Sequence, residues 1–492
     1  MLFNSAQFLL FFPLVTLFYF ALPHRVRYLW LLASSYYFYM CWNPEYALLM
    51  AASTLITYAS GLLITASRTK RARQAWVAAS FSANLAILFF FKYFNFAARV
   101  AAAAFGGRGV AVSPPHFDVI LPVGISFYTF QALSYTADVY RGDTPCEKNV
   151  LRYALFVSFF PQLVAGPIER SNHLLAQLRR RTSFDFARAK SGVMLMLWGY
   201  FEKVVVADRV AVAVNRAFED YAMLSGASVA VGVVLFAVQI YCDFAGYSDI
   251  AIGAARVYGV ELMQNFRRPY FAQTVQEFWR RWHISLSTWF RDYLYIPLGG
   301  SRRGTLRKYL NVMIVFLASG LWHGASGTFV VWGFLHGAMQ VAGGVTAKLR
   351  AKVRRALGIR EDSAFTRLYR RVFVFLLVCL TYVFFRAAGL GEAVGMLRAL
   401  ANPWRLSELA RGGLLALDLG LSAAEWCVLL ASAAALWLVD ALHERGVCIG
   451  AAVERWPRCW RWCAYLAAVL ALVVFGVYGP QFDASRFLYF QF

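Results

Sequence analysis

His323 lies at the end of an apolar run and is followed by small residues, in the segment from Gly320 to Ser326. A titratable ring inside an apolar segment needs a partner or a function. Imidazole has an ordinary pKa of about 6.5, which suits the removal of a proton from a hydroxyl group at neutral pH. His323 is therefore a candidate general base. A buried histidine bonded to a neighbouring carbonyl is the alternative.

Four other residues are candidates for supporting this chemistry. The indole N–H of Trp322, the hydroxyl of Ser326 or a backbone N–H could stabilise the negative charge of a tetrahedral intermediate, and the sequence does not choose among them. Asp243 and Asp292 are candidates for orienting a histidine, and helix capping is the alternative for each. His336 would point away from the candidate base in a continuous helix, so we predict a structural role for it.

An amphipathic stretch rich in tryptophan and arginine precedes the candidate base, at residues 278–300. Such a stretch suits the membrane interface, and the same position would frame the mouth of a cavity. Its arginines could attract an anionic donor from the cytoplasm, such as a coenzyme or a phosphopantetheine carrier. The predicted donor-binding residues are Trp279, Arg280, Arg281, Trp282 and Arg291.

The composition of the chain indicates an integral membrane protein built from helices. Of its 492 residues, 60% are hydrophobic and 15% are charged, and long uncharged runs recur along the whole chain. Each run approaches the roughly 20 residues that a helix needs to span the hydrocarbon. The net charge of +23 falls mainly in short loops between these runs, where the positive-inside rule places basic residues in the cytoplasm. We therefore predict the lipid bilayer as a partner, and not nucleic acid.

Ten crossings place every basic loop in the cytoplasm when the N-terminus lies outside, and they also place the C-terminus outside. The first crossing is expected to remain as a span, because no clear cleavage site follows it. The predicted crossings are residues 8–22, 28–42, 46–65, 76–91, 119–135, 192–207, 230–245, 372–390, 425–439 and 462–478.

Two apolar runs do not fit as crossings and are predicted to enter the membrane and return. Residues 154–168 lie between basic segments assigned to the cytoplasm and contain two prolines and a glycine, which break helices. Residues 309–322 would form about 21 Å of helix, against a hydrocarbon core of about 30 Å. His323 should therefore lie inside the bilayer, at the inner end of a cavity that is reached from the cytoplasm.

Four segments carry a resemblance to a known family. They are 160–168 (FPQLVAGPI), 239–249 (QIYCDFAGYSD), 278–300 and 321–324 (LWHG). The last two resemble the signature of the membrane-bound O-acyltransferase family, and the first two are similar to its alginate O-acetyltransferase branch. The resemblance implies an all-α polytopic membrane protein, a ring of about ten to twelve transmembrane helices with re-entrant and interfacial helices around a central funnel. It also implies that His323 is essential, and that His283 matches a second histidine that faces the cytoplasm.

The resemblance further implies one acyltransferase domain over residues 1–492. Its parts are N-terminal helices in 1–150, a catalytic core in 151–347, and C-terminal helices with an outer aromatic tail in 348–492. The implied activity moves an acetyl group from a cytoplasmic thioester, for O-acetylation of an extracellular polysaccharide such as alginate, at the bacterial cytoplasmic membrane. We expect no tightly bound cofactor and no metal ion, since the cysteines and histidines lack metal-ligand spacing.

Other functions remain open beside this one. Transfer of D-alanine or another acyl group to teichoic acid or peptidoglycan is the alternative within the family. A transporter or channel is the alternative outside it, because polar residues and re-entrant segments also mark conduction paths.

Two expectations concern the delivery of the acetyl group. No domain of the SGNH hydrolase type follows the last crossing, so we expect a separate extracytoplasmic transferase of that type as partner. Residues 487–492 resemble the aromatic tail of the small partner peptide in the teichoic acid D-alanylation system, in which a tyrosine hydroxyl accepts the acyl group. By that resemblance Tyr489 is a candidate acyl relay, and an aromatic interfacial anchor is the alternative.

Overall fold

The computed structural model describes residues 1–106, 121–361 and 363–478. Tyr489 and the predicted start of one crossing at residue 119 lie outside the described residues. The described residues form helices and contain no strand, so the prediction of an all-helical fold is confirmed. Contacts divide the chain into two compact units, residues 1–196 with 250–263, and residues 197–249 with the chain from 264 onward.

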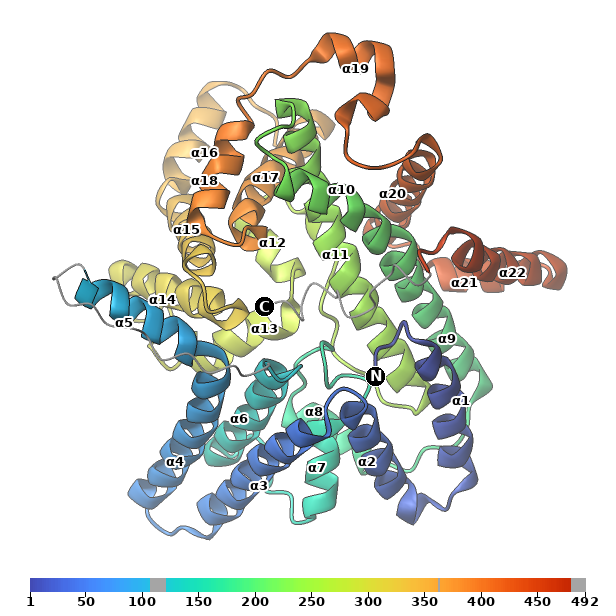
Figure 1. The fold of residues 1–492 in the computed structure, drawn as a ribbon. Coiled ribbons are helices and arrows are strands. Elements are labelled where there is room, and N and C mark those ends of the chain that lie inside the picture. The colour runs from blue at the N-terminus through green and yellow to red at the C-terminus, as the bar shows by residue number, and fades with distance from the viewer. Residues whose placement is uncertain (107–120, 362, 479–492) are drawn as a thin grey trace. The chain divides into compact units, whose positions relative to one another are not determined.

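The first unit contains the N-terminal helices. Its elements are α1 (Ala6–Ala21), α2 (His24–Met40), α3 (Pro44–Ala66), α4 (Lys70–Leu88), η1 (Phe89–Tyr93), α5 (Phe94–Gly106), α6 (Ile125–Arg141), α7 (Val150–Ser158) and α8 (Ser171–Leu178). Helices α3, α4 and α6 pack against one another, and α7 packs against α2 and α3 (Figure 1). The side chains of Asn43, Thr69 and Asn149 accept backbone N–H groups at the starts of α3, α4 and α7, which explains where these helices begin.

The predicted re-entrant segment at residues 154–168 is an interrupted helix, as expected. Helix α7 ends at Ser158, and the chain continues as buried turns through the proline-containing motif. Side chains replace the missing helical hydrogen bonds: the N–H of Phe160 donates to Ser35 Oγ at 3.1 Å, and Gln162 Nε2 donates to the carbonyl of Phe156 at 3.1 Å. Non-helical backbone is stable at membrane depth when protein groups satisfy it in this way.

The second unit contains both candidate catalytic histidines. Two helices belong to both units in part, α9 (Phe186–Tyr200) and α11 (Gly226–Val257). The remaining elements are η2 (Phe201–Ala207), α10 (Asp208–Glu219), η3 (Pro269–Phe271), α12 (Val275–Arg281), α13 (Ile284–Phe290), η4 (Arg291–Tyr295), α14 (Thr305–His323), α15 (Gly327–Val345), α16 (Ala347–Ala356), α17 (Ala364–Arg386), α18 (Leu390–Ala399), α19 (Leu406–Gly412), η5 (Gly413–Leu417), α20 (Ala423–Glu444), α21 (Ile449–Glu454) and α22 (Arg458–Phe475).

Seven helices of the described residues are long and apolar enough to cross a membrane. The predicted count of ten is not confirmed: α1 is apolar but short, and α2, α6 and α9 do not meet the same criterion at predicted crossings 28–42, 119–135 and 192–207. Conversely α15 qualifies as a span, although the sequence analysis did not count it. The qualifying spans are Pro44–Ala66, Lys70–Phe105, Gly226–Val257, Gly327–Val345, Ala364–Arg386, Ala423–Glu444 and Arg458–Phe475.

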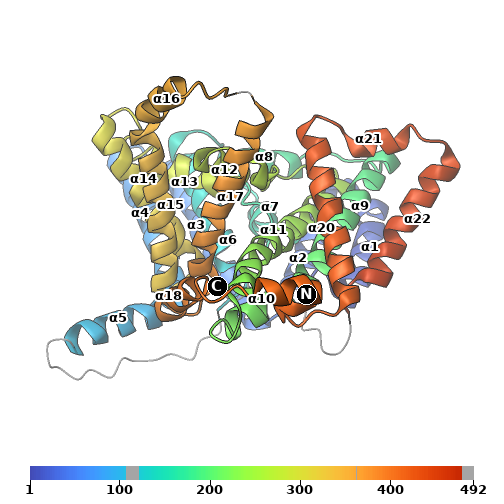
Figure 2. The ribbon, with the colours of Figure 1, turned by 90° about the horizontal axis from the view of Figure 1, so that it is seen from above.

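Helices α14 and α15 form a tight hairpin, and α17 packs against α15 (Figure 2). Each hairpin helix has 19 residues, about 28 Å. The helix α14 is therefore longer than the apolar run suggested, because it already begins at Thr305 in the basic segment. The close approach of the two helices requires glycine at positions 320 and 333. A β-carbon on either glycine would lie 3.3 Å from the Cα atom of the other glycine. It would also clash with a backbone carbonyl of the facing helix.

Candidate active site

Aromatic side chains form a cage around the ring of His323, the last residue of helix α14. Helix α14 ends at this residue, and Gly324 continues as extended chain. His323 is 4% exposed, and its ring centroid lies 5.0 Å from Trp322, 5.1 Å from Trp332 and 5.2 Å from Phe385. The cage holds the ring in one orientation and limits the access of bulk water to it.

The second histidine, His283, lies at the junction of α12 and α13 in an unusual backbone conformation. Its φ of 42° and ψ of 56° are left-handed, which costs a residue with a β-carbon about 1–2 kcal/mol. The ring is fully buried, with its centroid 6.4 Å from His323, 5.8 Å from Trp322 and 4.8 Å from Phe244. Strain of this kind persists where the surroundings enforce it, and it concentrates at functional sites.

Buried Asn265 holds the chain around this junction. Its carbonyl oxygen accepts the N–H of Ile284 at 2.9 Å, and its side-chain oxygen accepts the hydroxyl of Ser285 at 2.6 Å. Its Nδ2 donates to Ser248 Oγ of α11 at 3.0 Å. One asparagine thus ties the left-handed turn to α11, next to the helical turn that carries Phe244.

The electrostatics of the two histidines suit a division of labour. Burial lowers the pKa of His283 to about 3, so its ring is neutral at physiological pH. A neutral imidazole adds no positive charge beside His323 when that ring takes up a proton. The geometry is therefore compatible with His323 as the group that changes protonation state and His283 as a neutral polar neighbour.

His336 occupies a separate hydrogen-bonded position behind this cage. Its Nδ1 accepts the indole N–H of Trp279 at 3.2 Å, and its Nε2 lies 3.0 Å from the hydroxyl oxygen of Thr381, whose own proton goes to the carbonyl of Val378. These partners require the neutral Nε2–H form. The ring of Trp332 lies between the two histidines, 4.9 Å from His336 and 5.1 Å from His323. This arrangement supports the predicted structural role.

The other predicted supporting residues have partners of their own. Asp243 pairs with Lys203 at 2.5 Å, and Lys203 also pairs with Asp208 at 2.8 Å, so this carboxylate belongs to a buried ion cluster. Asp292 pairs with Arg291 at 2.7 Å. Ser326 accepts the N–H of Thr328 at 3.3 Å as the N-cap of α15. Catalytic roles for these three and for Trp322 stay predictions.

A cavity of about 1780 Å³ lies between helices α12 to α17. Three predicted donor-binding residues line it, Trp279, Arg280 and Arg291, whereas Trp282 and Arg281 do not. Arg281 instead pairs with Glu277 and Glu444. Of the residues that the structure describes, no aspartate or glutamate lines the cavity, and the basic lining residues are Arg280, Arg291, Lys308, Arg350, Arg354, Arg360 and Arg370.

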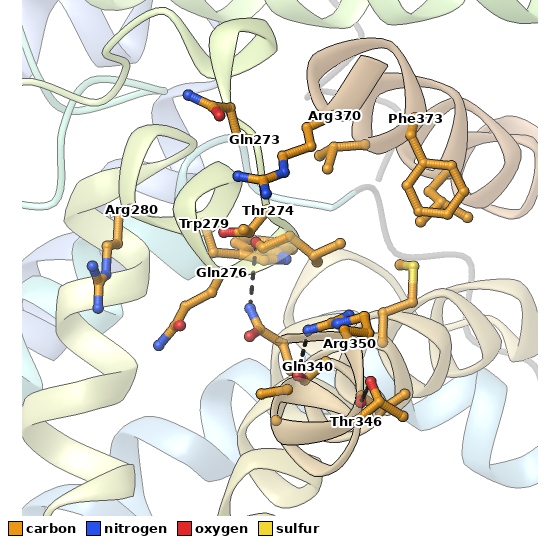
Figure 3. Close-up of a pocket in the computed structure, with 18 of the residues that line it drawn as sticks. Gln273, Thr274, Gln276, Trp279, Arg280, Gln340, Thr346, Arg350, Arg370 and Phe373 are labelled. Carbon is orange, nitrogen blue, oxygen red and sulfur yellow. Dashed lines mark hydrogen bonds between the residues drawn. The ribbon is translucent and has the colours of Figure 1, made fainter. Parts of the chain in front are cut away.

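The arrangement of these groups is visible in Figure 3. Arg280 projects from α12 on one side of Trp279, and Arg350 and Arg370 come from α16 and α17 on the other side. At its inner end the cavity touches Ser319, one helical turn before His323 on α14. The cavity thus offers an anionic ligand many cations and leads toward the catalytic candidate.

Several residues of the site escaped the sequence analysis. Phe385 and Trp332 reach His323 only through the packing of α15 and α17, and no local spacing indicates this contact. The sequence does indicate a special role for Lys203, because it is a charged residue within the predicted crossing 192–207. The arginines of residues 348–371 had been assigned to membrane topology alone, and four of them line the cavity.

Comparisons with known proteins agree with the geometry. The model of the membrane-bound O-acyltransferase family matches residues 147–385. The chain is similar to the probable alginate O-acetylase AlgI of Pseudomonas putida, with 41% identity over 426 residues, 85% of this chain and 84% of the relative. The AlgI protein of Pseudomonas syringae pv. tomato is 36% identical over the full length of both chains.

The chain belongs to the membrane-bound O-acyltransferase family. It is therefore an O-acyltransferase and a multi-pass membrane protein, as predicted, and the transporter alternative is not supported. The family match includes both His283 and His323 and ends at Phe385, which packs on His323. A peptidoglycan O-acetyltransferase of Helicobacter pylori is also similar, with 33% identity over 82% of this chain and 80% of the relative. Teichoic acid D-alanyltransferases are more distant relatives.

Proposed function

We propose that this O-acyltransferase transfers an acetyl group from a cytoplasmic thioester donor for the O-acetylation of an extracellular polysaccharide of the alginate type. One observation carries the proposal: His323 is buried at the end of α14, one turn beyond a cavity lined by cations. The similarity to probable alginate O-acetylases over most of the chain supports acetyl as the acyl group and alginate as the polysaccharide.

The chemical step follows from the position of the base. His323 takes the proton of the acceptor hydroxyl while the hydroxyl oxygen attacks the thioester carbonyl. The C–S bond then breaks, and the departing sulfur takes the proton from the imidazolium. Trp322 and the backbone at the helix break are the donors we propose for the oxyanion. The hydroxyl of Ser326 lies 3.0 Å from Thr328 Oγ1, to which it can donate its own proton.

The donor enters through the cationic cavity in this proposal. Acetyl-CoA and an acyl carrier protein both carry phosphate, so Arg280 and Arg291 suit either one. The acceptor side faces outward at the bacterial cytoplasmic membrane, where an SGNH-type transferase receives the acetyl group. Tyr489, on the outer C-terminal tail, is the proposed relay between the two proteins.

The variant His323→Ala tests the catalytic assignment. Purified protein is incubated with acetyl-CoA and alginate oligosaccharide, together with the extracytoplasmic transferase, and acetylated product is quantified by mass spectrometry. We expect a loss of about 10²- to 10⁴-fold, as is typical for removal of an acid–base group. The control His443→Ala changes a histidine of α20 and should retain activity. Near wild-type product from His323→Ala would refute the assignment.

The acceptor is a separate question, because the Helicobacter pylori relative is named a peptidoglycan O-acetyltransferase. The same assay with peptidoglycan fragments in place of alginate decides between the two acceptors. Transfer of acetyl to peptidoglycan alone would leave the mechanism intact and correct the polysaccharide.

A further inference from the structure

The outer part of the cavity, beside α16 and the start of α17, differs from the part near the histidines. Helix α15 separates the two ends, since its first residues adjoin the turn after His323 and its last residue precedes α16. With 19 residues, this helix is about 28 Å long. We call this part the outer limb, where outer means farther from the two histidines. The side chains that line it are of two kinds, basic and apolar. They are Arg350, Arg354, Arg370, Tyr369, Phe373 and Leu377.

Helix α16 turns one side toward the outer limb. At about 100° per residue, the lining residues of α16 fall within an arc of about 160°. These lining residues are Ala347, Leu349, Arg350, Val353 and Arg354, together with Leu357 at the C-cap. Three other basic residues fall on the opposite side and do not line the cavity, Lys348, Lys352 and Arg355. The helix therefore presents two arginines, framed by apolar side chains, to the outer limb.

Basic residues outnumber acidic ones in this region. Residues 347–371 contain nine lysines and arginines and two acidic residues. Glu361 forms ion pairs with two arginines, Arg354 at 2.9 Å and Arg370 at 3.7 Å. Arg350 donates a hydrogen bond to the carbonyl of Gly343 at 2.7 Å. Among the described residues that line the cavity none is acidic, so a ligand with a negative group would suit these cations.

Apolar side chains continue from the arginines along α17. This helix qualifies as a membrane span, and the lining residues Tyr369 and Phe373 are 60% and 51% exposed. The cavity volume of about 1780 Å³ exceeds the roughly 300–1,000 Å³ of ordinary small-molecule sites. Basic pockets between membrane helices on the cytoplasmic side suit anionic lipid head groups.

We propose that the outer limb binds an anionic phospholipid, with its phosphate on Arg350 and Arg370 and an acyl chain along Tyr369, Phe373 and Leu377. The phosphates of a thioester donor have the same chemistry at the arginines. The exposed apolar wall on a membrane helix favours the lipid, because a nucleotide donor would leave that wall uncovered. The lipid would remain chemically unchanged, so this site is additional to the acetyl-transfer site.

Lipid retention tests the proposal without any acetyl donor. The full chain is reconstituted in phosphatidylcholine vesicles that contain phosphatidylglycerol, extracted in mild detergent, and analysed by native mass spectrometry. Wild type should retain phosphatidylglycerol, and Arg350→Gln with Arg370→Gln should lower its affinity by at least about tenfold, because two charge-assisted contacts are lost. The matched control, Lys352→Gln with Arg355→Gln, removes the same charge from the other side of α16 and should behave as wild type.

Four results would overturn the lipid assignment. Equal loss in both double variants would mean that general surface charge attracts the lipid. Unchanged retention in the Arg350 and Arg370 variant would remove the site. Displacement of the lipid by free CoA, with a matching loss of CoA affinity in that variant, would assign the arginines to the donor. If this variant does not fold, a photoreactive side chain at Phe373 should crosslink to phosphatidylglycerol in the otherwise unchanged chain, and crosslinking to phosphatidylcholine alone would equally refute the proposal.

Discussion

The two histidines reach one site by different backbone routes. His323 ends a regular helix, whereas His283 occupies a left-handed turn that Asn265 ties to α11. Full burial keeps His283 neutral, since its pKa falls to about 3. A strained, neutral and buried histidine next to the candidate base indicates a residue selected for its position, and its protonation should be costly to the fold.

This cost predicts a pH dependence of stability. The pKa of His283 is about 3 in the folded chain and about 6.5 when unfolded, so between these values the unfolded state binds the extra proton. Stability should therefore fall as pH drops below about 6.5, by up to about 1.4 kcal/mol per pH unit from this residue. Asparagine tolerates left-handed backbone, so the variant His283→Asn should fold. It should lose the part of the pH dependence of stability that comes from His283. Thermal unfolding at pH 5.5 and 7.5 measures it.

A control variant shows whether replacing any histidine changes the pH dependence of stability. His24→Asn alters a histidine at the start of α2, outside the buried site, and should leave the wild-type slope unchanged. A His283→Asn protein with the wild-type difference between the two pH values would contradict the assignment of a buried, neutral ring.

At the scale of elements, the α14–α15 hairpin places the catalytic candidate. Gly320 and Gly333 allow the two helices to approach, and Trp332 then packs on His323 from the facing helix. Helix α17 adds Phe385 to the same cage. The position of the base therefore depends on the spacing of these helices.

We expect Gly333→Ala to move α14 away from α15. The added methyl group would meet the carbonyl oxygen of Phe316 and lie 3.3 Å from the Cα of Gly320. Overpacking of this kind costs about 1–3 kcal/mol, and the shift should also lower acetyl transfer because α14 carries His323. Gly391→Ala in α18 meets no atom within 4 Å and serves as the control. Unfolding temperature and activity are measured together, and wild-type values for Gly333→Ala would show that the hairpin is not tightly constrained.

At the scale of the whole molecule, the open question is which ends of the helices face the cytoplasm. The charge pattern predicts that the loop at residues 445–461 lies inside and that the end of the second crossing, near residue 42, lies outside. Two exposed cysteines lie at these points, Cys448 and Cys41. Labelling of these two natural cysteines can therefore report the membrane orientation, and no new cysteine has to be introduced.

Cysteine labelling tests this orientation directly. In variants that keep a single cysteine, a membrane-impermeant maleimide applied to spheroplasts should modify Cys41 and should modify Cys448 only after lysis. Each variant is the control for the other, since both thiols are exposed in the folded chain. The reverse pattern would invert the membrane orientation, and the proposed cytoplasmic entry of the donor would have to be abandoned.

The helical membrane class, the family and the candidate base follow from the amino-acid sequence alone. These features depend on local properties: apolar runs of membrane length, helix-breaking residues at 161–167, and an ordered motif around His323. The end of α14 at His323 and the interruption after Ser158 follow from the same local rules. The predicted crossings differ from the helices that qualify as spans, since they omit α15 and include α2, α6 and α9.

Which side chains meet depends on the packing of the helices. The approach of His283 to His323, the packing of Phe385 and Trp332 on the base, and the closing of one cavity by Arg280 and α16 all join residues far apart in the chain. Arg281, expected in the donor site, is instead paired with Glu444 across 163 positions. Such contacts depend on helix packing, which no single segment of sequence encodes on its own.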